Sequence, residues 1–166
     1  VQDLIEFLPG WKVLLGMRYD RLTGDYDAFG IPNTAPGPVT TASYRMKVSE
    51  VSKRAGLIYQ PNDRLSFHFS AATSFNTSGD AYSLSNANED IPPEQSINVE
   101  LGGRWESAGG NFTTRAAVFR STKLHERNTD PLVDLVTLSG KRHAAGLEID
   151  ITGRITPEWE VFGSYM

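Results

Sequence analysis

Apolar and polar side chains alternate along most of this chain with a period of two residues. In segment 11–20, WKVLLGMRYD, the odd positions are all apolar and the even positions are mostly polar or small. The same alternation recurs at 65–72, 98–105, 147–152 and 159–165. Successive side chains of a β-strand point to opposite faces, so this period predicts strands with one apolar face. Little of the chain has the period of a helix.

The alternation predicts an all-β fold, an antiparallel meander of about eight strands. Their expected ranges are 1–7, 11–26, 50–60, 64–75, 96–107, 111–124, 142–155 and 159–166. Short turns are expected at 8–10, 61–63, 107–110 and 156–158, and long loops rich in Gly, Pro, Ser, Thr and Asn at 25–49, 76–94 and 123–140. Alternation of tight turns and long loops is typical of bacterial outer-membrane barrels.

Composition narrows the classes of protein that remain. The chain has 166 residues, a net charge of −4, a pI near 5.4 and no cysteine. No basic stripe suggests nucleic-acid binding, and disulfide, Cys-zinc and thiol chemistry are excluded. Mean hydropathy is −0.33 and no run of 18 apolar residues predicts a membrane-spanning helix. A barrel strand is apolar only at alternate positions, so low hydropathy is compatible with a barrel.

Aromatic residues lie within a few positions of the short turns. Amphipathic rings prefer the headgroup level of a membrane, so these six residues predict an aromatic girdle at the membrane interface: Trp11, Tyr59, Phe67, Trp105, Phe112 and Trp159. The alternative is a soluble sandwich whose core aromatics happen to fall near turns. The opposite face of the strands carries charged residues, which favours the barrel, although a soluble sheet is also often half polar.

Five segments, in this order, resemble the barrel of TonB-dependent siderophore receptors. They are LPGWKVLLGMRYD at 8–20, RAGLIYQPND at 54–63, SF at 74–75, PE with VELGGRW at 93–105, and GLEIDITGRITPEWEVF at 146–162. Thr77 stands where the family often has a proline after Ser-Phe, so that match is imperfect. Each motif is weak alone, whereas their order and their positions at strand ends make a specific pattern.

The resemblance implies a segment of a larger, 22-stranded barrel plugged by an N-terminal domain in the bacterial outer membrane. Such a receptor imports ferric siderophores with energy relayed by TonB. Residues 1–166 would be a partial barrel without plug domain or C-terminal strand, since both ends of the chain fall within alternating strands. The implied partners are a ferric siderophore, TonB and the plug domain through the rest of the receptor, outer-membrane lipid and lipopolysaccharide.

Two other hypotheses remain at this stage. One is a complete small eight-stranded outer-membrane barrel with a binding or structural role. The other is a barrel enzyme such as an outer-membrane lipase or protease. No sequence motif places Ser, His and Asp together, and His68, His125 and His143 lack metal-ligand spacing. We therefore expect no catalytic residues, no metal and no cofactor, and we expect His68 to face the lumen.

Ligand contacts are expected from aromatic and basic residues of the extracellular loops and the lumen mouth. Aromatic rings could pack a flat chelate and Arg could pair with its negative charge. On position alone, the candidates are Tyr26, Phe29, Tyr44, Arg45, Tyr82 and Arg120. A dense group of charges at two neighbouring strand ends is expected on the extracellular side, where it would contact lipopolysaccharide phosphates, be solvated, or attract an anionic ferric siderophore: Arg120, Lys123, Glu126, Arg127, Lys141 and Arg142.

Overall fold

The structure is a computed structural model that describes residues 1–30, 37, 39–76, 91–130, 135–138 and 140–166. Eight strands form one antiparallel sheet in the order β1-β2-β3-β4-β5-β6-β9-β10. Their bounds are β1 Gln2–Leu8, β2 Trp11–Gly30, β3 Thr40–Asn62, β4 Leu65–Asn76, β5 Glu94–Glu106, β6 Phe112–Leu124, β9 Lys141–Thr156 and β10 Trp159–Tyr165. The predicted all-β meander is confirmed.

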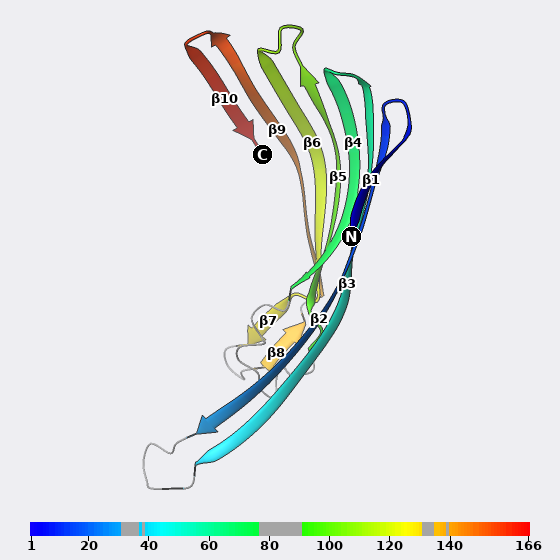
Figure 1. The fold of residues 1–166 in the computed structure, drawn as a ribbon. Helices are drawn as coiled ribbons and strands as arrows, with labels where there is room; N and C mark the ends of the chain where they lie inside the picture. The colour runs from blue at the N-terminus through cyan, green and yellow to red at the C-terminus, as the bar shows by residue number, and fades with distance from the viewer. Residues whose placement is uncertain (31–36, 38, 77–90, 131–134, 139) are drawn as a thin grey trace.

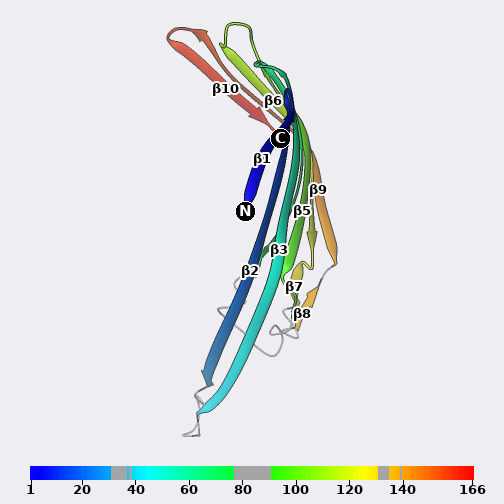
Figure 2. The same cartoon turned by 45° about the vertical axis from the view of Figure 1, so that its right-hand side comes forward.

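The sheet is a single curved layer with the short turns at one end (Figures 1 and 2). The turns β1–β2, β3–β4, β5–β6 and β9–β10 gather there, and the other ends of these strands point the opposite way (Figure 1). Gly10 and Gly110 adopt positive φ angles of 76° and 71° in two of these turns, a conformation that favours glycine. Short turns are confirmed close to the four predicted positions, whereas most of the long loop predicted at 76–94 lies outside the described residues.

The sheet is open in the part of the chain that the structure describes. The edge strand β1 pairs with β2, and the edge strand β10 pairs with β9. No pairing joins the two edges. The hypothesis of a complete, closed eight-stranded barrel is therefore wrong for this structure. Within the described ranges there is also no helix with the length and apolar character needed to cross a membrane.

Cross-strand register separates the side chains into two faces. On the apolar face, one row crosses five strands and consists of exposed large hydrophobic residues: Leu57, Phe69, Leu101, Val118 and Leu147. On the polar face, the neighbouring row runs from Ile58 through His68, Gly102 and Ala117 to Glu148. A contiguous apolar surface of this extent is unusual for a water-exposed monomer and indicates contact with lipid or a protein partner.

The prediction of a first long loop at 25–49 is wrong over most of that range. Strand β2 continues to Gly30 and β3 already begins at Thr40, and their register is unbroken from Trp11–Tyr59 to Gly30–Thr40. Side-chain pairs link the two strands beyond Asp20: Arg45 with Asp25, and Ser43 with Asp27. Both faces of this extension are partly polar, which made its sequence resemble a loop. We call the extension, residues 21–30 and 40–50, the β2–β3 arm.

The β2–β3 arm forms the small buried cluster of the molecule. Met46 and Val48 are the buried hydrophobic residues among those described, and Tyr26, Tyr44 and Phe75 pack against them. Pairing of β3 with β4 ends at Arg54–Ala72 on the side of the arm. Beyond that point Phe75, which alternates in phase with the apolar face of β4, meets the polar face of β3. The arm and the end of β4 thus form a local second layer.

The third predicted loop, at 123–140, contains a hairpin that was not expected. Strands β7 (Arg127–Asp130) and β8 (Leu135–Leu138) pair with each other as a separate two-stranded sheet. Strand β6 ends at Leu124, as predicted, and β9 begins at Lys141, one residue before the predicted start. Segments this short carry little period-two signal, which explains why the sequence did not reveal them.

Candidate functional site

A hollow of about 380 Å³ lies on the polar face, lined by residues of β3, β4, β5, β6 and β9. Two rows of cross-strand neighbours build it. One row brings His68 and Glu148 to either side of Gly102 and Ala117, and the other aligns Ser66, Arg104, Arg115 and Asp150. We call the ionisable members of this group the polar-face cluster: His68, Glu100, Arg104, Arg115, Glu148 and Asp150.

Small residues make room for the polar-face cluster. A Cβ on Gly102 would lie 2.6 Å from His68 Cε1 and 2.9 Å from the carbonyl oxygen of Ala116. The imidazole therefore lies across β5 at a position that only glycine leaves free. From there His68 Nε2 is 2.7 Å from Glu100 Oε1, two residues along β5 from Gly102. Alternation in the sequence places His68 on the polar face, and the register of β4 against β5 brings it into contact with Glu100.

Ion pairs are common on the polar face. Arg18 Nε donates to Asp20 Oδ2 at 2.7 Å, Lys123 Nζ lies 3.0 Å from Glu94 Oε1, and Arg104 pairs with Glu106. An exposed pair such as Arg18–Asp20 contributes about 0–1 kcal/mol, so it orders the side chains more than it stabilises the sheet. Glu94 differs because its carboxylate is buried. The face is suited to water or to a polar protein surface.

The cluster does not form a recognisable catalytic arrangement among the described contacts. His68 is held by Glu100, and no hydrogen bond joins it to Ser66, the hydroxyl residue of the same hollow. A nucleophile needs a base within hydrogen-bond reach. Within the described residues, no group of three or more His, Cys, Asp or Glu side chains is placed to hold a metal ion.

The predicted ligand residues divide between the two faces. Tyr26 and Tyr44 are cross-strand neighbours on the polar face of the arm, stacked with ring centroids 6.4 Å apart. Phe29 is exposed on the opposite face, beside Thr41. Arg45 is on that face too, and its pKa is raised because Asp25 accepts a hydrogen bond from it and attracts its charge. Of these four predicted ligand residues, the structure brings only Tyr26 and Tyr44 together.

Two other predicted ligand residues do not join the tyrosines. Arg120 is placed by register on the apolar face, between Val99 and Ala145. Alternation from Val118 turns its side chain away from the polar face, and its contact with a ligand stays a prediction. Tyr82 lies outside the described residues.

The six predicted girdle residues lie near the short turns, as their sequence positions imply. Trp11 stacks on Tyr59 with centroids 4.4 Å apart, and Phe67 is the next cross-strand neighbour of Tyr59. Phe112 lies over Gly153, where a Cβ would come within 2.1 Å of its ring. Trp105 and Trp159 are half exposed or more. Membrane contact by these rings stays a prediction.

Sequence reasoning missed two features of these surfaces. The arm cluster of Met46 and Val48 was overlooked although Tyr44, Met46 and Val48 alternate with Arg45, Lys47 and Ser49. The His68–Glu100 contact could not be foreseen because it depends on the register of β4 against β5. The first had a signal in the sequence, whereas the second did not.

Comparison with known proteins gives a consistent result. The family model described as TonB dependent receptor-like, beta-barrel matches residues 1–166. The catecholate siderophore receptor Fiu of Escherichia coli is 28% identical over 186 residues, covering 98% of this chain and 24% of the relative. The metal-pseudopaline receptor CntO of Pseudomonas aeruginosa is 25% identical over 166 residues, covering 99% and 23%.

Solved structures show the same fold. The siderophore receptor PiuA from Acinetobacter baumannii superposes with a TM-score of 0.79 at 25% identity, covering 98% of this chain and 24% of that one. A crystal structure of Fiu from E. coli also gives a TM-score of 0.79, at 22% identity. The chain spans 22% to 24% of the length of the curated relatives it matches.

Proposed function

The chain belongs to the TonB-dependent receptor β-barrel family, and from this premise we propose that it forms part of the wall of an outer-membrane receptor that imports ferric siderophores. The observation that carries the proposal is the division of one open sheet into an exposed apolar face and a charged face. A strand in a barrel wall needs both, because one face meets lipid and the other meets the lumen. Its role is transport, not catalysis.

The apolar face fits the lipid side of such a wall. Hydrocarbon offers no hydrogen bonds, so a spanning sheet must satisfy its backbone groups by pairing. Each interior strand of the sheet (β2, β3, β4, β5, β6 and β9) has a neighbour on both sides, and the two edges would pair with strands of the rest of the receptor. The aromatic residues around the short turns would then form the periplasmic girdle.

The polar-face cluster fits the lumen side. Arg104, Arg115, Glu148 and Asp150 present both signs of charge around an open hollow. In the complete receptor we expect this surface to face water and the plug domain, and TonB would act through parts of the receptor outside this chain. Contacts between a wall and a plug that has to move are better made by exposed, hydrated charges than by a buried apolar core.

The cargo is inferred from the relatives. The names of Fiu and PiuA describe siderophore receptors, and that of CntO a metal-pseudopaline receptor. A chelate of a metal by an organic ligand is the chemistry these cargos share. Within this chain we propose that the stacked Tyr26–Tyr44 pair on the polar face of the arm contacts such a chelate.

The import proposal is tested in cells that lack the receptor. The full-length receptor containing this chain is restored from a plasmid, and uptake of radiolabelled iron is measured with catecholate and hydroxamate siderophores. We expect TonB-dependent uptake of at least one of them, and no uptake in a strain without TonB. Equal uptake with and without the receptor, for every siderophore tried, would contradict the proposal.

The tyrosine contact is tested in the same receptor. Replacing Tyr26 and Tyr44 by Ala removes two rings, and loss of stacking with a bound chelate is worth about 0.5–1.5 kcal/mol per ring. We therefore expect roughly tenfold weaker binding of the transported siderophore in a fluorescence-quenching titration. The matched control is Phe29→Ala on the opposite face of the arm. If Phe29→Ala weakens binding as much as the tyrosine changes do, the proposed contact is wrong.

A further inference from the structure

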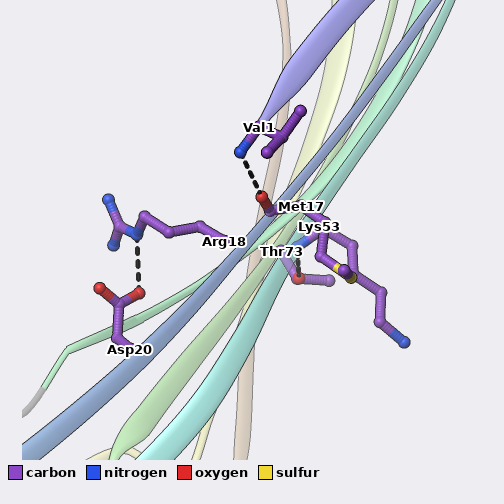
Figure 3. A network of polar contacts seen from close by, with 6 residues as sticks. All are labelled: Val1, Met17, Arg18, Asp20, Lys53 and Thr73. Atoms are coloured by element: carbon purple, nitrogen blue, oxygen red, sulfur yellow. Dashed lines mark hydrogen bonds and ion pairs between the residues drawn. The ribbon is translucent and has the colours of Figure 1, made fainter.

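The pairing of β3 with β4 ends partway along β3. Its register pairs run from the turn up to Arg54–Ala72, whereas β3 itself extends to Thr40. Just past the last pair, the backbone N–H of Lys53 donates to Thr73 Oγ1 at 3.0 Å (Figure 3). From there to its end, β3 is paired only with β2 among the described residues. The arm therefore has an open strand edge on the side of β3 that faces away from β2.

The direction of the backbone groups shows which residues of β3 face the open edge. Met17 and Val1 exchange two backbone hydrogen bonds of 3.0 Å, so odd residues of β2 point their N–H and C=O groups toward β1 and even residues toward β3 (Figure 3). Register pairs Arg18 with Ser52, so the even residues of β3 point theirs toward β2. The odd residues of β3 therefore face the open edge, in agreement with the N–H of Lys53.

A hollow of about 540 Å³ lies along the open edge. Six consecutive residues of β3, 45–50, line it, so it follows the backbone edge and not one face of the strand. Ile91, Pro92 and Pro93 line it from the segment that leads into β5. Proline has no N–H, so this segment cannot pair with the edge as a regular strand would. We call the space between residues 45–50 and 91–93 the edge hollow.

Two residues present their backbone groups to the edge hollow. Lys47 and Ser49 are odd residues of β3, and both are exposed. On this side no backbone hydrogen bond joins either of them to another described residue. Groups that face one side of a strand recur every second residue, about 6.8 Å apart. The edge hollow thus offers two donors and two acceptors at the spacing that an extended amide chain requires.

The side chains of the edge hollow leave recognition mainly to the backbone. Lys47 and Glu50 carry opposite charges, and Arg45 pairs with Asp25. The lining therefore has no strong preference for one sign of charge. A ligand that matches this site is one with amide groups of its own, because N–H and C=O groups are what a strand edge binds.

The edge hollow adjoins the residues that are proposed to contact the chelate. Met46 and Val48 line the hollow, and Tyr26 and Tyr44 pack against the same two side chains. A ligand stacked on the tyrosines would therefore have the open edge within reach. The volume of the hollow is within the range of about 300–1,000 Å³ that is typical of small-molecule sites. Both observations favour a part of the cargo over a long polypeptide strand.

We propose that the edge hollow binds secondary amides of the transported metal chelate. The N–H and C=O groups of Lys47 and Ser49 pair with the ligand as a neighbouring strand would, so that main-chain hydrogen bonds give the affinity. This inference rests on the proposed import of a chelate and specifies its chemical class. The organic ligand has an amide backbone, either peptidic or built from arms that are joined by amides.

The test removes one edge N–H from the full-length receptor. In Ser49→Pro the lost N–H faces the open edge, so the pairing of β3 with β2 keeps its hydrogen bonds, and proline is tolerated at such edge positions. Ser49→Ala keeps the N–H and removes the hydroxyl group. Thr41→Pro makes the same backbone change on the same side of β3 but outside the edge hollow. Binding of a ferric trihydroxamate and a ferric tris-catecholate, both with amide-linked arms, is measured by fluorescence quenching.

We expect Ser49→Pro to bind the imported complex about threefold to tenfold more weakly, as the loss of one hydrogen bond implies. Ser49→Ala and Thr41→Pro should bind it as the unmodified receptor does. The ligand is varied in parallel. N-methylation of its amides blocks their N–H groups and should weaken binding to the unmodified receptor by a similar factor, a result that does not depend on the folding of a proline variant.

Four results would overturn the inference. Ser49→Pro binds the complex as the unmodified receptor does, Thr41→Pro weakens binding as much as Ser49→Pro, or N-methylation of the ligand has no effect. The fourth is displacement of the complex by a metal-free extended decapeptide at a lower concentration than the chelate needs, which would assign the edge to a polypeptide partner. Uptake of iron separates the two proposals. If the unmodified receptor imports iron and Ser49→Pro binds normally, this inference alone fails, whereas a receptor that imports none of the complexes refutes the import proposal.

Discussion

At the scale of single residues, glycine decides where rings lie on this sheet. Phe112 covers Gly153, Phe119 covers Gly146 and His68 covers Gly102, each across one strand. A Cβ at any of the three glycines would come closer than 3.0 Å to the ring. Aromatic rings laid over cross-strand glycines restore the packing that glycine lacks and shield the backbone. The glycines are therefore part of the two surfaces and not points of weakness.

Gly153 provides the sharpest test of this packing. In Gly153→Ala the new methyl group would lie 2.1 Å from the Phe112 ring, so the ring must leave its position. Overpacking of this kind costs about 1–3 kcal/mol. We expect the full-length receptor to unfold at lower urea concentration in detergent, with a change in that range.

Gly163→Ala is the matched control, because a Cβ at Gly163 would meet nothing within 4 Å. Equal stability of the two variants would show that Phe112 does not pack on Gly153 in the receptor.

At the scale of elements, β2 and β3 stand out because they are 20 and 23 residues long, the longest strands of the sheet, and their outer halves form the β2–β3 arm. A two-stranded hairpin is marginally stable in water. The arm is supported by the cluster around Met46 and Val48 and by the contact of Gln95 with Glu50, whose Nε2 and carboxylate oxygens are 3.2 and 3.3 Å apart. The arm thus depends on packing against β4 and β5 and not on its own pairing alone.

Met46→Ala should loosen the arm selectively. Met46 is 3% exposed, and removing its side chain from this small cluster is expected to cost about 2 kcal/mol. In hydrogen-exchange mass spectrometry of the full-length receptor, amides of the arm should exchange faster, whereas those of β5 and β6 near the turns should not change.

Lys47→Ala is the control on the next residue, whose exposed side chain leaves the strand on the other face. The packing argument is refuted if Lys47→Ala accelerates exchange in the arm as much as Met46→Ala does.

At the scale of the whole molecule, two open edges are the main physical constraint. Strands β1 and β10 each leave one side without a partner in the described sheet. Such edges pair readily with other chains, and a hydrocarbon environment cannot satisfy them. The exposed apolar rows add to this tendency. The sheet is suited to a place within a larger closed wall.

The 166-residue chain refolded alone in detergent should therefore give β-rich aggregates. Comparing boiled with unboiled samples on a gel, we expect no band of altered mobility, whereas the full-length receptor is expected to show one. A soluble monomer that shifts on boiling would mean that the eight strands close by themselves, and would refute the argument from open edges.

Much of the fold was accessible from the sequence. Alternation gave the eight strands, and turn residues such as Pro9-Gly10 and Gly109-Gly110 marked the short connections. Residues 27–30 and 40–49 of the arm were misread as a loop, because polar residues on both faces hide the alternation. Of the predicted ligand residues, the stacked pair Tyr26–Tyr44 lies together, whereas Arg120 is on the apolar face.

The sequence by itself determined the two faces, because side-chain direction along a strand depends only on the parity of position. It also determined the turn ends and, through its motifs, the family. Only the tertiary structure decided which charges meet. Contacts such as His68 with Glu100 and Arg45 with Asp25 join residues on different strands. Their partners are set by register, and a shift of one residue would turn every side chain of a strand to the other face.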